Sequence, residues 1–400
     1  MLIKNVLHDG TLSDILIRRG LFEVIAPAGE ELSAEGAEVY DASGLAILPA
    51  LYNTHTHAAM TLLRGYADDM PLQKWLQEYI WPFEDGLTAL DIRQGSVDAV
   101  REMILSGTTF FSDMYFDIEE TIDEVARSGM RAAIGITVME NHSKAVEEEK
   151  LDFVREWKDP TGGRIQLVMD PHAIYTVGEQ KLRRTAEFAR SNALRLSIHL
   201  SETVGEVQDC LREHGTTPVR YLDSIGFLGP DVIAAHCVHV DREEWDILAS
   251  RGVTVSHCPC SNMKLGSGRF PYEMALQSGC RITLGTDGAS SNNNLDLREE
   301  MKAAALLSKC VAASPDGSLV NRGNPELLPA PLVLEWGTKN GAEAFGVDGG
   351  VVSEGKVADA ILVDLSDPRM IPCHNLVSNF VYSADSSCIA RVICDGKFIK

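Results

Sequence analysis

The chain has 400 residues, enough to bury a large core, and a formal net charge of -22. So acidic a surface repels phosphate backbones, and no Lys- or Arg-rich block interrupts it, which excludes nucleic acid as a partner. No apolar run approaches the roughly 20 residues that span a bilayer, and the N-terminus lacks a signal-peptide pattern, so we expect a cytoplasmic protein with no membrane contact.

Both ends of the chain have the pattern of short strands separated by turns, without a helical period. Neither end has enough apolar residues for a core of its own, so we expect residues 1–48 and 353–400 to pair into one small β-sandwich domain. The runs with this pattern are 1–7, 14–17, 21–25, 39–41, 358–363, 376–382, 389–394 and 397–399.

Between these ends, strand-like runs alternate with amphipathic helical segments, which is typical of parallel βα units. The alternation predicts an α/β fold in which residues 49–352 form a catalytic (β/α)8 TIM barrel. The eight strand-like runs are 45–57, 108–114, 131–138, 164–172, 195–200, 232–239, 253–258 and 281–287. The helical segments that separate them include 90–105, 118–128, 180–191, 242–250 and 295–312.

Six of the strand-like runs end in side chains that catalysis could use. His55 and His57 come first, and their spacing of two puts both imidazoles on one face of a strand. The carboxyl ends of barrel strands share one mouth, where active sites lie. The later runs end in His172, His199, His236, His257 and Asp287. We interpret His8, His142, His214 and His374 as ordinary core or surface residues.

Three imidazoles and one carboxylate suit a divalent ion such as Zn²⁺ with a position left open for water. The predicted ligands are His55, His57, His199 and Asp287. Such an ion lowers the pKa of water to about 7 and makes hydroxide available for hydrolysis. Fe²⁺, Mn²⁺ or Co²⁺ would also suit these ligands. Because no predicted strand ends in the lysine that often bridges two ions, one metal ion is the simpler proposal.

Two further side chains at the predicted mouth can assist hydrolysis. Glu202 follows the fifth strand-like run and can carry protons between nucleophile, substrate nitrogen and leaving group. A Glu favoured at a helix N-terminus is the alternative interpretation, which the nearby His199 makes less attractive. His236 would then polarise the hydroxide or stabilise the tetrahedral intermediate.

The motifs around these residues resemble those of the amidohydrolase superfamily, and within it the 5'-methylthioadenosine/S-adenosylhomocysteine deaminases and the related chlorohydrolase and guanine deaminase group. The resemblance extends nearly end to end, including the small β domain, where residues 355–359 read GKVAD. The motifs that carry it are LPALYNTHTH (48–57), IHLSE (198–202), AAHCVH (234–239), VSHCP (255–259), SNMKLG (261–266) and LGTDGASSN (284–292).

The resemblance implies metal-dependent deamination of an adenine nucleoside and a role for each matching residue. His55, His57, His199 and Asp287 would hold one zinc ion, and Asp287 would take a proton from the attacking water. Glu202 would bind and protonate the ring nitrogen, while His236 would orient the hydroxide. The residues that would bind substrate are Trp75, Glu84 and His172, together with Glu202 and Asp287. For Trp75 a core role is the alternative, since Trp75, Tyr79 and Phe83 recur at helical spacing.

One region departs from the family pattern. Relatives that act on S-adenosylhomocysteine present arginines after the third strand to bind its carboxylate, whereas residues 136–144 contain none. Adenosine, 5'-deoxyadenosine or 5'-methylthioadenosine would therefore fit better. Ala50, where relatives often have Gly, should be harmless.

Two alternatives stay open. The same metal chemistry could act on another heterocycle, such as guanine, a pterin or a chlorinated triazine. The barrel could also have lost catalysis and serve as a binding protein, although every expected ligand and Glu202 are present. The H-x-E and P-C-x-x-C signature of cytidine deaminases is absent from the sequence. The partner we expect is a small-molecule substrate, and the acidic surface is compatible with a monomer or a homo-oligomer.

Overall fold

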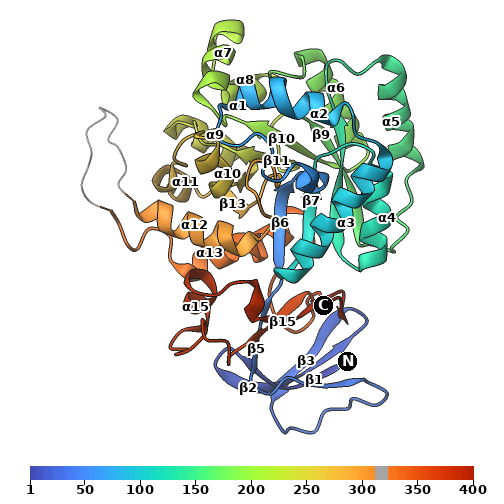
Figure 1. The fold of residues 1–400 in the computed structure, drawn as a ribbon, viewed down its shortest axis with the longest axis vertical. Coiled ribbons are helices and arrows are strands. Elements are labelled where there is room, and N and C mark those ends of the chain that lie inside the picture. The colour runs from blue at the N-terminus through green and yellow to red at the C-terminus, as the bar shows by residue number, and fades with distance from the viewer. Residues whose placement is uncertain (311–322) are drawn as a thin grey trace.

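A computed structural model describes residues 1–310 and 323–400 and contains a barrel of eight parallel strands (Figure 1). Neighbours in the barrel follow chain order from β6 to β13. The last and first strands meet where Asp287 N donates to His55 O at 3.0 Å and Thr54 Oγ1 donates to Leu284 O at 2.9 Å. The strands are β6 (Leu51–Thr56), β7 (Thr108–Asp113), β8 (Arg131–Val138), β9 (Ile165–Pro171), β10 (Arg195–Leu200), β11 (Val232–His236), β12 (Thr254–His257) and β13 (Arg281–Leu284). The predicted TIM barrel is confirmed.

Helices surround the barrel and pack their apolar faces on its strands (Figure 1). The helices along the barrel are α3 (Ala89–Leu105), α4 (Ile118–Ser128), α5 (Lys144–Glu156), α6 (Glu179–Ser191), α7 (Val204–His214), α8 (Pro218–Ser224), α9 (Arg242–Arg251), α10 (Pro259–Lys264), α11 (Tyr272–Ser278), α12 (Leu297–Lys309), α13 (Ala330–Gly337) and α14 (Lys339–Ala344). The last two residues of the predicted helical segment 295–312 lie outside the described residues. No helix of residues 1–310 and 323–400 is long and apolar enough to cross a membrane.

The chain between β6 and α3 lies over the end of the barrel that is farther from the chain termini (Figure 1). We call residues 58–84 the covering segment. Its apolar side chains form a small core with Ile92 and Tyr115. The segment consists of η1 (Ala58–Leu63), α1 (Leu72–Trp75), η2 (Leu76–Ile80) and α2 (Trp81–Glu84).

Strands from both chain ends form one mixed sheet beside the barrel, where Figure 1 also places the N- and C-termini. Its order is β16-β15-β14-β5-β1-β2-β3, and β4 pairs with β1. Its own core includes Ile3, Phe22 and Leu362. The strands are β1 (Leu2–His8), β2 (Thr11–Arg18), β3 (Leu21–Pro27), β4 (Val39–Asp41), β5 (Leu45–Pro49), β14 (Ala360–Asp364), β15 (Ile389–Cys394) and β16 (Lys397–Phe398).

The structure corrects two predicted strands. The run 45–57 is two strands, because β5 pairs with β14 in the terminal sheet and only β6 enters the barrel. The run 376–382 is the helix α15 (Leu376–Tyr382). Asn375 starts this helix, since its side chain accepts a hydrogen bond from Ser378 N. Only Phe380 and Val381 are buried there, so the apolar run has one buried face and no strand partner.

Candidate metal centre and substrate pocket

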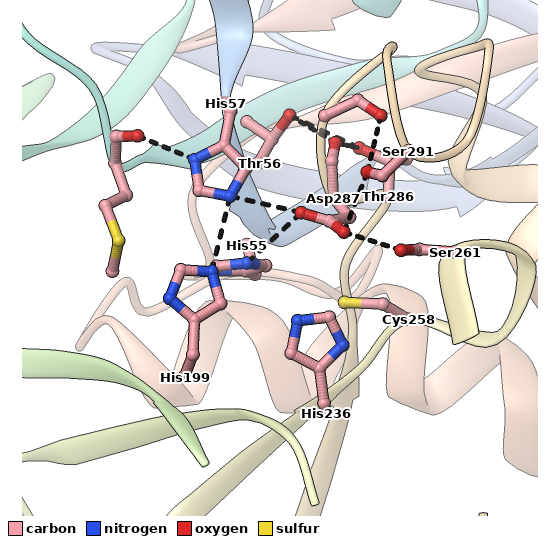
Figure 2. A network of polar contacts seen from close by, with 12 residues as sticks. His55, Thr56, His57, His199, His236, Cys258, Ser261, Thr286, Asp287 and Ser291 are labelled. Carbon is pink, nitrogen blue, oxygen red and sulfur yellow. Dashed lines mark hydrogen bonds and ion pairs between the residues drawn. The ribbon is translucent and has the colours of Figure 1, made fainter. Parts of the chain in front are cut away.

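Four histidines and one aspartate converge at the carboxyl ends of the barrel strands (Figure 2). His55 lies in β6 and His57 directly follows it, while His199 lies in β10. His236 ends β11, and Asp287 follows β13. The backbone at His236 and Asp287 is left-handed, with φ of 72° and 60°. Non-glycine residues rarely adopt this conformation, and its presence at two strand ends is typical of a functional site.

The polar atoms of these side chains lie close enough to share one ion. Asp287 Oδ1 is 3.1 Å from His57 Nε2 and 3.5 Å from His55 Nε2. His199 Nε2 is 3.4 Å from His57 Nε2. His55, His199, His236 and Asp287 each offer a ligand atom within 4.8 Å of the others. The structure thus brings the four predicted ligands together and adds His236 to the group.

Hydrogen bonds fix how two of the imidazoles face this centre. His57 Nδ1 donates to Met114 O at 2.7 Å, and His199 Nδ1 donates to His172 O at 2.8 Å. A carbonyl oxygen only accepts, so the proton sits on Nδ1 and Nε2 is turned to the centre. His55 Nε2 is buried and has no hydrogen-bond partner among the described residues. An unsatisfied buried nitrogen between such groups fits a bound cation.

The protonation of the histidines also suits a metal ion, since imidazole binds metal in its neutral form. Burial lowers the pKa of His55 to about 4, and burial followed by the neighbouring imidazoles holds the pKa of His199 well below its usual value. His57 differs from them. Burial lowers its pKa, but the Asp287 carboxylate raises it by more than burial lowers it, so the pKa of His57 is about 9. A cation bound between His57 and Asp287 would take the place of that proton.

Two serines orient the carboxylate of Asp287 (Figure 2). Asp287 Oδ2 accepts from Ser261 Oγ at 2.6 Å and from Ser291 Oγ at 2.8 Å. Because these donors occupy Oδ2, Oδ1 faces His55 and His57. The sequence analysis missed both serines, although each lies in one of the motifs on which the family resemblance rests, SNMKLG and LGTDGASSN.

Glu202 and His236 lie beside the same centre. Glu202 Oε1 accepts from Ser267 Oγ at 2.9 Å, and its Oε2 is 3.9 Å from His236 Nε2. His236 Nδ1 bonds Asn262 Oδ1 at 2.8 Å. The Asn262 oxygen only accepts, so the proton is on Nδ1 and Nε2 is free to contact a substrate or water.

A pocket extends from this centre to the covering segment. Its wall includes His57, His199, His236 and Asp287 on one side and apolar residues of the covering segment on the other. The predicted substrate residues Trp75, Glu84, His172 and Glu202 also line it. Trp75 is 4% exposed and belongs to the core of the covering segment, so this side chain both fills the core and faces the pocket.

Two other histidines of the sequence analysis, His257 and His142, have different surroundings in the structure. His257 ends a strand as predicted but is buried against Phe270 and bonds Tyr272 Oη at 2.9 Å, which accounts for it structurally. His142, interpreted from the sequence as an ordinary residue, lines the pocket. Lys150 and Tyr115 line it as well. Lys150 lies on α5, outside the segment 136–144 in which the sequence analysis sought a cation.

Comparisons with known proteins agree with this geometry. Residues 46–399 match the model of the amidohydrolase family. A 5'-deoxyadenosine deaminase of Methanosarcina acetivorans is 44% identical, over 98% of this chain and 87% of the relative. A 5-methylthioadenosine/S-adenosylhomocysteine deaminase of Haloarcula marismortui is 42% identical, over 97% of this chain and 88% of the relative.

A solved structure adds a zinc-containing relative. An adenosine deaminase from Xanthomonas campestris with bound zinc superposes with a TM-score of 0.86 at 30% identity, covering 99% of this chain and 91% of its own. The family model covers most of the chain, and the full-length relatives share both its fold and its sequence. The chain therefore belongs to the amidohydrolase family.

Proposed function

We propose that the protein is a metal-dependent hydrolase that deaminates an adenine nucleoside to its inosine analogue and ammonia. The observation that carries this proposal is the full-length similarity to deaminases of 5'-deoxyadenosine and 5-methylthioadenosine/S-adenosylhomocysteine, at 44% and 42% identity. These nucleosides, together with adenosine, are the substrates to test first. A pocket with a polar end at the barrel strands and an apolar wall opposite suits a heterocycle with a reactive exocyclic group.

The proposed ligands of one divalent ion are His55, His57, His199 and Asp287, and zinc is the proposed metal. Support comes from the neutral imidazoles of His55 and His199, from His55 Nε2, which is buried without a hydrogen bond among the described residues, and from the zinc in the Xanthomonas campestris relative. Such an ion, when bound, supplies a Lewis acid and makes hydroxide available at neutral pH. The other steps fall to side chains of this chain.

Two side chains can move the protons of the reaction, and a third can orient the attacking oxygen. Water adds to the carbon that carries the amino group, and Asp287 passes one of its protons to that amino group, which leaves as ammonia. Glu202 delivers the other proton to the ring nitrogen, so the product retains a ring N–H. His236, 3.9 Å from Glu202, can orient the attacking oxygen. The two serines on Asp287 keep its Oδ1 directed toward this oxygen.

The other pocket residues would hold the rest of the nucleoside. His172 Nδ1 bonds Thr176 Oγ1 at 2.8 Å, which fixes a ring whose centroid is 4.8 Å from that of His199. Trp75 offers an apolar surface on the covering segment, and Glu84 offers a carboxylate that can accept from sugar hydroxyls.

Lys150 lines the pocket and is the side chain that we expect to attract an anionic 5' substituent. Its Nζ donates to Thr137 O at 2.6 Å and lies within ion-pair distance of no carboxylate in residues 1–310 and 323–400. His142 lines the pocket beside it, and its Nδ1 accepts from Met139 N at 3.3 Å. The pocket therefore contains one cation that the arginine-free segment 136–144 did not predict. A substrate with an anionic tail fits better than the sequence alone indicated.

An ultraviolet assay of zinc-loaded protein tests the function. We expect loss of the amino group from adenosine, 5'-deoxyadenosine and 5'-methylthioadenosine, and slower loss from S-adenosylhomocysteine. Removal of the metal by a chelator should abolish turnover, and added Zn²⁺ should restore it. Reaction with guanine or a pterin alone would contradict the substrate proposal and favour the heterocycle alternative.

The proton path has a separate test. We expect Glu202→Gln to lower kcat by about 10²- to 10⁴-fold, the size of general acid-base catalysis, while the metal content stays that of wild type. Asp287→Asn should abolish turnover and also lower metal content, because it removes a proposed ligand. Near wild-type kcat in Glu202→Gln would refute the mechanism, whatever the substrate.

A further inference from the structure

A hydrogen bond joins the covering segment to the barrel inside the pocket. Tyr115 Oη donates to Glu84 Oε1 at 2.7 Å. Glu84 ends α2, whereas Tyr115 follows β7, and both side chains line the pocket. Tyr115 is 4% exposed, so its hydroxyl would be buried without a partner if Glu84 turned away.

The barrel holds the Tyr115 side of this pair in place. The ring of Tyr115 stacks on Phe116 with centroids 4.2 Å apart, and the carbonyl of Tyr115 accepts from Thr137 Oγ1 at 2.7 Å. Thr137 belongs to β8, so the backbone of Tyr115 is anchored to two adjacent strands. Glu84, in contrast, is half-buried at the end of a short helix of the covering segment. The fixed phenol therefore determines where the Glu84 carboxylate lies.

Electrostatics keep Tyr115 as the proton donor of this pair. Burial raises the pKa of Glu84, and the hydrogen bond from Tyr115 acts in the opposite direction. Burial, and then the charge of Glu84, raise the pKa of Tyr115 far above its usual value, so the phenol keeps its proton. Tyr115 thus donates to a carboxylate that still has lone pairs for further donors.

The chemistry of the proposed substrate identifies those donors. An adenine nucleoside has N–H donors at its amino group and O–H donors on its sugar. In the proposed reaction the amino group lies at the metal centre, which leaves the sugar hydroxyls for a carboxylate on the covering segment. Tyr115 already holds one oxygen of the Glu84 carboxylate. The carboxylate therefore loses less conformational entropy when it accepts hydrogen bonds from two neighbouring hydroxyls.

We propose that Tyr115 is a positioning residue for the sugar, which fixes the Glu84 carboxylate so that it selects nucleosides with an intact 2',3'-diol. This inference rests on the proposed function and adds a determinant of its substrate class. Tyr115 acts through Glu84 and touches no reacting atom. Its effect should therefore depend on the sugar and not on the base or the metal.

The test compares Tyr115→Phe with wild type on adenosine and on 2',3'-dideoxyadenosine. We expect Tyr115→Phe to lower kcat/KM for adenosine about tenfold, mainly through KM, as loss of one hydrogen bond to a charged group predicts. The dideoxy substrate should be turned over by Tyr115→Phe within about twofold of wild type, since its sugar offers no donors to Glu84. In Glu84→Gln, the additional change Tyr115→Phe should have little further effect.

Tyr66→Phe is the matched control. Tyr66 is 39% exposed, packs against Phe83 of the covering segment and also loses only a hydroxyl. We expect it to leave both substrates unaffected. Equal losses on both sugars, or additive losses in the double variant with Glu84→Gln, would overturn the role of Tyr115 while the deaminase function stands. If wild type deaminates no adenine nucleoside, the proposed function fails and this inference fails with it.

Discussion

Single side chains in the pocket show which roles spacing in the sequence can reveal. The i, i+2 histidines and the polar strand ends predicted that His55, His57, His199 and Asp287 would lie together, and they do. That they bind metal stays a prediction. Strand periodicity carries this information because the carboxyl ends of all barrel strands meet at one place. The sequence analysis missed Ser261, Tyr115 and Lys150 because their positions depend on loop and helix packing, which no spacing rule describes.

Lys150 allows a pH-dependent prediction at this scale. Burial lowers the pKa of Lys150 to about 8. The ammonium is therefore charged below about pH 8 and neutral above it, so any attraction for an anionic tail is lost as pH rises through 8. We expect the kcat/KM ratio of S-adenosylhomocysteine to 5'-deoxyadenosine to fall about fivefold between about pH 7 and pH 9.

The variant Lys150→Met is the control for this prediction. It keeps the apolar stem but has no charge, so the substrate ratio should be low at every pH and should not titrate. Initial rates with both substrates at each pH give the ratio directly and cancel effects common to both. A wild-type ratio that stays flat across this range would contradict the assignment of Lys150 to the tail.

Individual strands and helices were predicted well where a regular pattern continued over many residues. Helix α4 and strand β8 have the predicted bounds, and the capping box of Thr88 and Asp91 starts α3 within one residue of its predicted start. The run 45–57 was misassigned because an apolar stretch does not show which sheet its residues join. Residues 376–382 were misassigned because seven residues are too few to distinguish a helix from a strand by period.

Strand β8 packs so closely against its neighbours that Gly135 has no room for a side chain. A Cβ at Gly135 would lie 1.8 Å from Asp170 Oδ2 and 2.5 Å from Asp113 O. The Asp170 carboxyl is fully buried, and neither oxygen has a hydrogen-bond partner among the described residues. We expect Gly135→Ala to lower the free energy of unfolding by about 1–3 kcal/mol, the usual cost of overpacking, as measured by urea denaturation.

A double variant separates this contact from a general backbone effect. Asp170→Ala removes the closest of the contacts that the new methyl group would make and leaves the one with Asp113 O, so Gly135→Ala combined with Asp170→Ala should recover part of the stability that Gly135→Ala loses alone. Gly205→Ala in α7 is the control, because its Cβ would meet only Thr203 Oγ1 at 3.7 Å and Ala favours a helix. Additive losses in the double variant would mean that the clash is not with Asp170.

The whole molecule depends on how the two chain ends join the barrel. The βα alternation predicted the barrel, and the lack of a core in either end predicted their pairing in one β unit. We propose residues 1–48 with 353–400 as one domain and residues 49–352 as the other. The contacts between the sheet and the barrel could not be predicted, because they join residues more than 200 positions apart through side chains that have no local pattern.

Asp359 is the centre of those contacts. Its Oδ2 accepts from Tyr52 Oη at 2.6 Å and from Arg131 Nε at 3.0 Å, and its Oδ1 accepts from Asp395 N at 2.7 Å. Tyr52 and Arg131 are barrel residues near the amino ends of β6 and β8, whereas Asp359 and Asp395 adjoin strands of the terminal sheet. Asp359 is fully buried, so the network is shielded from water and from salt.

Removing this carboxylate should therefore weaken the whole molecule without altering its chemistry. We expect Asp359→Ala to lower the free energy of unfolding by about 3–5 kcal/mol, because the charged, buried Arg131 loses its buried partner and keeps only the half-exposed carboxylate of Asp395. Asp152→Ala, which breaks the exposed pair with Arg155, should cost less than about 1 kcal/mol in the same urea titration. Below its unfolding temperature Asp359→Ala should keep the wild-type kcat, since the network lies at the amino ends of the strands and the metal centre at their carboxyl ends. Similar costs for the two variants would show that the buried network does not hold the sheet to the barrel.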